Sequence, residues 1–183
     1  MKIQIDQKEF ERLIEYDQIK KRIRLIGIEL NVAYEHRNPV FLGVLNGCFM
    51  FMGDLMKEVS IASEVCFIKL KSYYGTTRSE HTTELIGLDV ELRGREIIIV
   101  EDIIDKGDSL AHTLDMVRSY QPASVAVCSL LYKPGSVKHV FHNLAYIGFE
   151  IANDFVVGYG LDYRGMGRNL RDIYKEVTEK QTS

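Results

Sequence analysis

Apolar runs alternate along the chain with segments whose apolar residues recur at helical spacing. Helical spacing is clearest in 17–36, where an apolar residue recurs every three or four positions. Two further helices are expected at 49–59 and 110–120, and strands at 39–45, 64–70, 97–100, 124–132, 146–149 and 155–159. The run Ile-Ile-Ile-Val at 97–100 is typical of a strand buried on both faces of a parallel sheet. Alternating strands and helices joined by short turns predict an α/β fold with a doubly wound, mostly parallel sheet.

Composition narrows the class of protein. The formal charge is −3 and the pI is about 6.0, so no global basic field favours bulk binding of nucleic acid. Cys48, Cys66 and Cys128 are far apart in apolar segments, which is typical of reduced core cysteines rather than disulfides or a metal site. The first residues lack the apolar stretch of a signal peptide, and no apolar run approaches the roughly 20 residues needed to cross a bilayer. We therefore expect a cytoplasmic protein without a membrane segment.

Five candidate functional residues lie close together after the strand at 97–100. Glu101 and Asp102 come directly after the strand, and Asp105 follows them. Gly107 and Ser109 then lead into the helix expected at 110–120. Ligands of α/β proteins bind at the carboxyl ends of parallel strands, and the free N–H groups of a helix N-terminus suit a phosphate. Carboxylates suit ribose hydroxyls or a hard metal ion. Together these features predict a site for a phosphorylated sugar.

This segment resembles the phosphoribosyl-pyrophosphate loop of the type I phosphoribosyltransferases. The sequence Val-Glu-Asp-Ile-Ile-Asp at 100–105, with Gly107 and Ser109, is closest to the hypoxanthine-guanine branch. The resemblance extends over roughly 40–168. It implies a single domain, 1–183, of the type I phosphoribosyltransferase kind. It also implies a small hood over the carboxyl edge of the sheet, formed by about 1–36 and 145–183.

The resemblance assigns roles to the three acids. Glu101 and Asp102 would bind the ribose 2′- and 3′-hydroxyls, directly or through a magnesium ion. Asp105 would be the catalytic acid–base group that accepts the proton of the purine N7. The alternative for Asp105 is a simple N-cap of the helix that follows.

The phosphate cradle departs from the family pattern. Lys106, Gly107, Asp108 and Ser109 would surround the 5′-phosphate with backbone N–H groups and the Ser109 hydroxyl. Lys106 stands where the family commonly has threonine or serine, and Asp108 stands where a neutral or basic residue is common. An acid beside a phosphate is unfavourable by about 1–4 kcal/mol at 4 Å in wet surroundings. Either Asp108 points to solvent with its charge offset by Lys106, which we prefer, or phosphate affinity is weaker than usual.

Two later segments carry the expected purine site. Lys133 ends the sequence Ser-Leu-Leu-Tyr-Lys at 129–133, where the family has a lysine that donates to the oxygen at purine position 6. Such a donor selects 6-oxopurines over adenine. In Phe-Val-Val-Gly-Tyr-Gly-Leu-Asp-Tyr at 155–163, resemblance implies that Phe155 stacks on the base and Val156 binds its edge through main-chain groups. Asp162 would ligate magnesium, a third metal ligand beside the acids at 101 and 102. Arg168 would bind pyrophosphate, with a surface ion pair as the alternative.

Two further segments complete the expected site. By resemblance, the turn Leu45-Asn46-Gly47 holds pyrophosphate through backbone N–H groups; Asn46 replaces the usual lysine. Ser72 and Tyr73 open the polar segment 72–84, which has no apolar periodicity. That segment is either an ordinary surface loop or a lid that closes over the reacting ribose.

These observations predict a magnesium-dependent enzyme of purine salvage. It would transfer the 5-phosphoribosyl group of phosphoribosyl pyrophosphate to N9 of hypoxanthine, and plausibly of guanine, giving IMP or GMP and pyrophosphate. The resemblance also implies a homo-oligomer, dimer or tetramer, for which the apolar segment 49–55 gives weak support. Two alternatives stay open. One is an RNA-binding, nucleotide-sensing regulator of the same fold, and the other is a transferase that prefers xanthine or another base.

Overall fold

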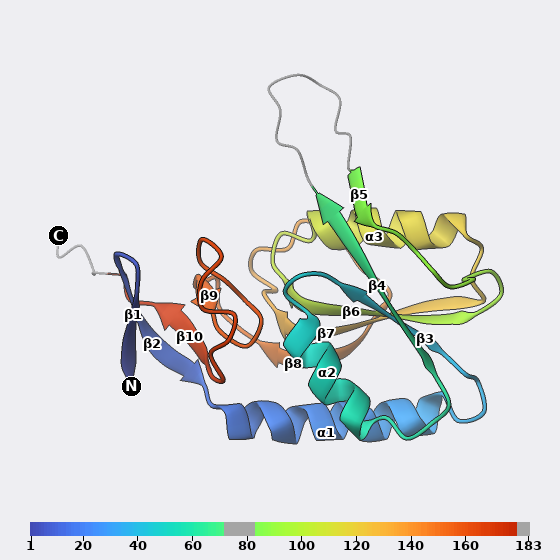
Figure 1. Cartoon of the computed structure of the whole chain (residues 1–183), viewed down its shortest axis with the longest axis horizontal. Coiled ribbons are helices and arrows are strands. Elements are labelled where there is room, and N and C mark those ends of the chain that lie inside the picture. The colour runs from blue at the N-terminus through green and yellow to red at the C-terminus, as the bar shows by residue number, and fades with distance from the viewer. Residues whose placement is uncertain (72–82, 179–183) are drawn as a thin grey trace.

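A six-stranded sheet forms the centre of the computed structural model, which describes residues 1–71 and 83–178 (Figure 1). Its strand order is β5-β4-β3-β6-β7-β8. The strands are β3 (Val40–Val44), β4 (Glu64–Lys71), β5 (Thr83–Ile86), β6 (Glu96–Ile104), β7 (Ser124–Tyr132) and β8 (Leu144–Glu150). All neighbours pair in parallel except β5, which lies antiparallel to β4 at one edge. The predicted mostly parallel sheet is confirmed.

Helices cover both faces of this sheet. α1 (Tyr16–Ala33) and α2 (Phe49–Glu58) lie on one face, and α3 (Asp108–Ser119) lies on the other (Figure 1). The uniform apolar run of β6 explains this arrangement, because successive side chains of a strand point to opposite faces. Ile98 and Val100 pack in the cluster that includes α1 and α2, whereas Ile97 and Ile99 pack in the cluster that includes α3. The sheet is therefore doubly wound, as the sequence predicts.

A second, four-stranded antiparallel sheet forms the hood. Its order is β1-β2-β10-β9, with β1 (Lys2–Ile5), β2 (Lys8–Ile14), β9 (Val156–Val157) and β10 (Ile173–Glu176). Ile5, Phe10, Val157 and Tyr174 form its small core. The hood therefore joins the two ends of the chain, but it is smaller than the sequence suggested.

The expected hood limits of 1–36 and 145–183 are too wide. α1 packs against α2 and β8, and its buried face belongs to the main core. β8 pairs with β7 in the main sheet. The sequence-based limits placed the apolar stripe of 17–36 and the strand at 146–149 in the hood because both lie near the chain ends. Packing and strand pairing place both segments in the main domain instead.

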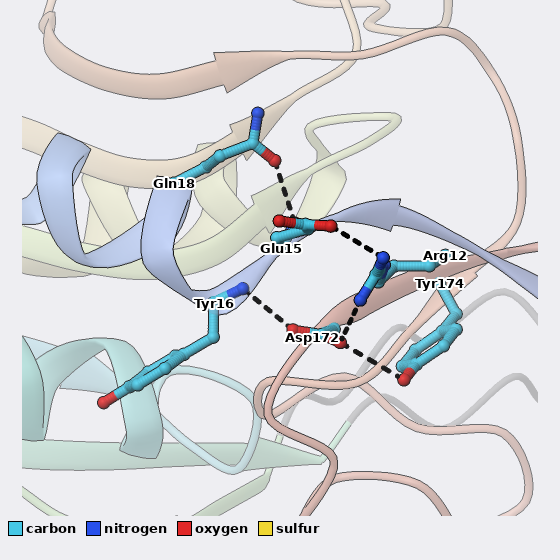
Figure 2. A network of polar contacts seen from close by, with 6 residues as sticks. All are labelled: Arg12, Glu15, Tyr16, Gln18, Asp172 and Tyr174. Carbon is cyan, nitrogen blue, oxygen red and sulfur yellow. Dashed lines mark hydrogen bonds and ion pairs between the residues drawn. The ribbon is translucent and has the colours of Figure 1, made fainter. Parts of the chain in front are cut away.

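Asp172 joins the hood to the beginning of α1 (Figure 2). Its Oδ1 accepts a hydrogen bond of 2.8 Å from the backbone N–H of Tyr16, the first residue of α1. Its Oδ2 lies 3.6 Å from Arg12 Nη1 and 3.4 Å from the Tyr174 hydroxyl. Arg12 also pairs with Glu15 at 2.6 Å. A free N–H group at the helix start is thus satisfied from the hood, which fixes the hood against the main domain.

Besides shifts of a few residues at most element ends and the unpredicted strand β10, the structure differs from the sequence-based elements in four places. β6 continues to Ile104, so Glu101 and Asp102 lie inside the strand and not after it. The strand expected at 155–159 is only Val156–Val157. The segment expected as a lid, 72–84, overlaps β5 at its last two residues, while 72–82 fall outside the described residues. The hairpin of β1 and β2 was not predicted.

No helix in the described part of the chain is long and apolar enough to cross a membrane.

Candidate active site

An open cavity of about 360 Å³ lies at the carboxyl ends of β3 and β6. Its walls are formed by Val44, Leu45, Gly47 and all residues from 101 to 110. The cavity therefore brings together two segments that are more than fifty positions apart in the sequence. Both were predicted to contact the sugar donor.

Glu101 and Asp102 form an acidic floor of this cavity. Glu101 is 5% exposed, and burial together with the neighbouring Asp102 raises the pKa of Glu101 well above its usual value. Burial also raises the pKa of Asp102 to about 6, although the N–H of Ile103 and the charge of Arg168 oppose that rise. Within the described residues, no hydrogen bond or ion pair joins the Glu101 side chain to another side chain. Two adjacent carboxyl groups in such surroundings favour a cation or hydroxyl donors as a partner.

The turn after β3 fits closely over this floor. An ideal Cβ placed on Gly47 would lie 1.6 Å from Asp102 Oδ2, so the Asp102 carboxyl occupies the space that any other side chain would need. The peptide bond between Leu45 and Asn46 is cis. Gly160, from the loop after β9, approaches the same turn, because a Cβ on it would lie 2.1 Å from the Gly47 carbonyl oxygen. The hood thus touches the rim of the cavity directly.

The beginning of α3 provides the anion-binding groups of the cavity. Gly107 precedes the helix with φ 88°, a conformation that favours glycine, and a Cβ there would lie 2.9 Å from the Phe141 ring. The first helical bond runs from the Ala111 N–H to the Gly107 carbonyl at 2.9 Å. The N–H groups of the first helical residues therefore have no partner within the helix, and the Ser109 hydroxyl lies among them.

Asp108, the acid in this cradle, pairs with a histidine. Its Oδ1 lies 2.7 Å from His139 Nε2, and both side chains are substantially exposed. The hydrogen bond from His139 holds the pKa of Asp108 below its usual value, with smaller contributions from Lys138 and Lys106. The Asp108 side chain is exposed, as the preferred interpretation expects, and its direct partner is His139 rather than Lys106.

Asp105 accepts two charge-assisted contacts. Its Oδ2 lies 2.9 Å from Lys133 Nζ, and its Oδ1 accepts a hydrogen bond from the Ser136 hydroxyl. Burial raises the pKa of Asp105, but the Ser136 and Lys133 contacts outweigh it and hold the pKa below its usual value. The alternative of an N-cap is wrong: the cap position belongs to Gly107, and no side chain caps this helix.

Lys133 itself is 4% exposed, and its backbone N–H donates to the Ile104 carbonyl at 3.0 Å. Adjacent carboxyl ends of β6 and β7 therefore place Lys133 beside Asp105, although 27 residues lie between them. A buried lysine paired with a carboxylate at the edge of a cavity is a candidate functional site.

Arg168 and Asp162 face one another above the turn. Arg168 Nη2 lies 2.5 Å from Asp162 Oδ1, and Arg168 Nη1 donates to the Gly160 carbonyl at 2.7 Å. Asp162 also accepts a hydrogen bond of 2.7 Å from the Gly165 N–H. The ion pair given as the alternative for Arg168 is therefore present, and it lies close enough to influence Asp102.

Phe155 and Val156 lie in the hood. Phe155 is 41% exposed and packs against Tyr163, with ring centroids 5.9 Å apart, and against Phe10 at 6.3 Å. Val156 is buried and pairs with Lys175 of β10. Neither is among the described residues that line the cavity. An exposed ring held by two aromatic neighbours remains a suitable face for a planar ligand.

The donor set of the acidic floor fits a hard cation only in part. Carboxylate oxygens are what such an ion prefers, and Glu101 and Asp102 supply them. Among the residues that the structure describes, however, no three acidic, histidine or cysteine side chains gather closely enough to hold an ion. Asp162 is instead paired with Arg168. A metal here would need further oxygen ligands from a bound phosphate compound and water, which is how Mg²⁺ is usually held.

Two polar residues of this site were missed in the sequence. Ser136 and His139 both lie in the loop after β7, in the stretch Lys-Pro-Gly-Ser-Val-Lys-His. The Pro-Gly pair marks a turn that could bring later residues back toward the strand end, and that is the one signal the sequence offers. The proposed lid residues Ser72 and Tyr73 lie outside the described residues.

Comparison with known proteins agrees with this geometry. A family model described as a phosphoribosyl transferase domain matches residues 14–164. Hypoxanthine phosphoribosyltransferase of Escherichia coli is 39% identical over 170 residues, which cover 91% of this chain and 95% of that protein. The bifunctional protein TilS/HprT of Listeria innocua is 40% identical over 159 residues, and this chain spans only 24% of its length.

A solved structure gives the same result. The hypoxanthine-guanine phosphoribosyltransferase of Bacillus anthracis, with a HEPES molecule in its active site, superposes with a TM-score of 0.83 at 32% identity. The match covers 92% of this chain and 97% of that one.

Proposed function

Because the chain belongs to the hypoxanthine-guanine branch of the type I phosphoribosyltransferase family, we propose that it transfers a 5-phosphoribosyl group to a 6-oxopurine. The donor is phosphoribosyl pyrophosphate, and the acceptor is N9 of hypoxanthine, with guanine as a second substrate. The products are IMP or GMP and pyrophosphate, so the reaction belongs to purine salvage.

One observation carries the proposal. The acids Glu101 and Asp102, the free N–H groups at the start of α3 and the turn 45–47 line a single cavity, with the Asp105–Lys133 pair at its edge. These groups match the parts of one molecule: the ribose hydroxyls, the 5′-phosphate and the pyrophosphate. A simple anion site would not need two buried carboxyl groups, which repel anions.

The chemistry of the sugar explains the buried acids. Departure of pyrophosphate from the anomeric carbon makes the ribose electron-poor, and carboxylates fixed nearby stabilise that developing charge. Glu101 and Asp102 are held in place by the strand β6, so they need no rearrangement during the reaction. Arg168, together with the N–H groups of the turn at 45–47, would hold the leaving pyrophosphate.

The purine side of the reaction uses Asp105 and Lys133. When N9 bonds to the ribose, N7 loses a proton, and the Asp105 carboxylate would accept it. Lys133 would donate to the oxygen at position 6 of the base. Adenine carries an amino group there, a donor that cannot accept a hydrogen bond from the Lys133 ammonium. Phe155 would stack on the base, a contact worth about 1–3 kcal/mol, and Val156 would bind its edge through the main chain.

A divalent cation, which we propose to be Mg²⁺, would be held by Glu101, Asp102 and oxygens of the donor. It would neutralise the pyrophosphate as that group leaves. Asp162 would serve as a further ligand through water, provided that Arg168 turns from Asp162 toward the pyrophosphate. The residues Ser72 and Tyr73 would belong to a lid over the ribose.

The protein is also proposed to be a homo-oligomer in the cytoplasm. The segment 49–55 gives less support than expected, because Phe51, Met52 and Leu55 are buried in the protein's own core. A different surface supports self-association: Leu25, Ile28 and Val32 form an exposed apolar stripe on α1. Light scattering after gel filtration tests the oligomeric state.

A base panel tests the proposed function. Hypoxanthine, guanine, xanthine and adenine are each assayed with phosphoribosyl pyrophosphate and Mg²⁺, and nucleotide formation is followed by absorbance. We expect turnover of hypoxanthine and guanine. Preference for xanthine would correct the acceptor, turnover of adenine alone would overturn the role of Lys133, and no turnover with any base, together with RNA binding, would favour the regulator.

A further inference from the structure

Asp108 is an acid in the position where the proposed 5′-phosphate would bind. It is the first residue of α3 and one of the residues that line the cavity. An acid is favourable at a helix N-terminus, but beside a bound phosphate it repels the ligand. The site therefore works well only if something draws the Asp108 charge away or neutralises it.

His139 is placed to do both. The Asp108 carboxylate can only accept a hydrogen bond, so the His139 Nε2–H donates across the 2.7 Å contact. The loop that carries His139 is fixed to the cradle by the Lys138 N–H, which donates to the Lys106 carbonyl at 3.0 Å. The His139 ring packs 5.7 Å from the Phe141 ring, and Phe141 in turn closes against Gly107. The imidazole is thus held by its own packing as well as by Asp108.

We propose that His139 is a positioning residue of the donor site, which holds the Asp108 carboxylate outside the phosphate cradle and offsets its charge through a direct hydrogen bond. This inference rests on the function proposed above and adds to it a specific determinant of donor affinity. It also accounts for an acid in the cradle, because the histidine keeps the carboxylate of that acid paired and away from the bound phosphate.

The hydrogen bond from His139 is the largest cause that holds the pKa of Asp108 below its usual value. The charged groups that face the pair are Lys106 in the cradle and Lys138 in the His139 loop, and both help to lower the same pKa. Without the imidazole, the Asp108 carboxylate would be free to turn toward the bound phosphate and weaken donor binding.

A double-mutant cycle tests this coupling. The variants are His139→Ala, Asp108→Asn and the double variant, with His142→Ala as the matched control from an exposed position of the same loop. The readouts are the KM for phosphoribosyl pyrophosphate, kcat, the KM for hypoxanthine and the Kd of ribose 5-phosphate by calorimetry. His139→Gln is added, because it keeps a hydrogen-bond donor at this position.

We expect His139→Ala to raise the donor KM and the ribose 5-phosphate Kd by about three- to tenfold. The kcat and the hypoxanthine KM should stay close to the His142→Ala values. In the Asp108→Asn background the same change should have almost no effect, because no acid remains to be held. His139→Gln should restore most of the affinity, because it keeps a donor for the Asp108 carboxylate.

Equal losses in the two backgrounds, or donor affinity of His139→Ala that equals that of the His142→Ala control, would overturn the inference while leaving the proposed function intact. A wild-type protein that binds neither donor nor ribose 5-phosphate would overturn the proposed function, and this inference with it.

Discussion

Lys133 Nζ lies 2.9 Å from Asp105 Oδ2, so the group proposed to recognise the purine oxygen is held against the group proposed to accept the purine proton. The contact has two effects. It keeps the nearly buried ammonium paired, and it helps to lower the pKa of Asp105. A 6-oxopurine entering the site would offer Lys133 a second acceptor and so would weaken its hold on Asp105. The proposed roles therefore predict that base recognition and proton transfer are linked.

Asp105→Asn tests proton transfer. The amide keeps the size of the side chain and can still accept from Lys133, but it cannot take up the N7 proton. We expect kcat to fall by roughly 10²–10⁴-fold, with little change in donor affinity. Steady-state kinetics and calorimetry with phosphoribosyl pyrophosphate measure the two effects. Asp115→Asn, an exposed change on α3, is the control. Equal losses of kcat and donor affinity would assign Asp105 to binding or folding instead.

Lys133→Met tests base selection and the pKa of Asp105 together. We expect the hypoxanthine KM to rise by about 10- to 100-fold, since a charged hydrogen bond is lost, and the preference against adenine to weaken. The pKa of Asp105 should rise, because Lys133 helps to hold it below its usual value. Activity that needs the ionised carboxylate is lost as pH falls through that pKa, so the acid limb of the pH profile should move to higher pH.

The same change at Lys57, an exposed lysine of α2, is the control for Lys133→Met. If Lys133→Met left both the hypoxanthine KM and the acid limb where they are in the control, Lys133 would have no part in recognising the base.

The sequence predicted the main sheet well because the signal is local. The uninterrupted apolar residues of β6 are buried on both faces only when helices cover both faces of the sheet. That burial also fixes Glu101 and Asp102 near the carboxyl edge of the sheet. The hairpin of β1 and β2 was missed because only Ile5, Phe10 and Ile14 are buried in it and the apolar alternation is short. β2 also pairs with β10, about 160 residues away in the sequence, and no local pattern indicates that pairing.

The polar partners in the site were the hardest to predict. Asp108 pairs with His139 and Asp105 with Ser136, each across a separation of 31 residues. Nothing local indicates such pairs, because the path of the loop after β7 decides them. The family resemblance did not supply them either, since it concerns positions along the chain and not the side-chain contacts between them.

Asp102→Asn tests how far the buried Asp102 carboxylate lowers the free energy of unfolding. Burial raises the pKa of Asp102 from 3.8 to about 6, so the folded protein binds the proton more tightly than the unfolded chain. The free energy of unfolding should therefore fall as pH rises from about 4 to about 6, and stay low above that range. The amide removes this loss, since it carries no charge and still accepts the Ile103 N–H. We expect it to stabilise the ligand-free protein near pH 8 by on the order of 1–3 kcal/mol and to weaken donor binding.

Urea unfolding of wild type and Asp102→Asn near pH 4 and near pH 8 measures this effect. The gain in stability should be confined to the higher pH. A variant no more stable than wild type near pH 8 would show that the Asp102 carboxylate is not strained in the absence of a ligand.

Gly47→Ala tests the close fit of the turn over the floor. The added methyl group would meet Asp102 Oδ2 at 1.6 Å, so either the turn or the carboxyl group must move. We expect lower stability and a donor KM raised by at least about tenfold, because small misplacement of such groups is costly. Gly53→Ala, where nothing lies within 4 Å of the new methyl group, is the control. That change, within α2, should stabilise the protein by up to about 1 kcal/mol. Similar donor KM values for the two variants would argue against the tight fit.

The most direct measurement is a crystal structure of the protein with phosphoribosyl pyrophosphate and Mg²⁺. The account predicts ribose hydroxyls within hydrogen-bond or metal-bridged reach of Glu101 and Asp102, and the 5′-phosphate on the N–H groups at the start of α3. A donor bound at another place, with both acids free of ligand and metal, would contradict it.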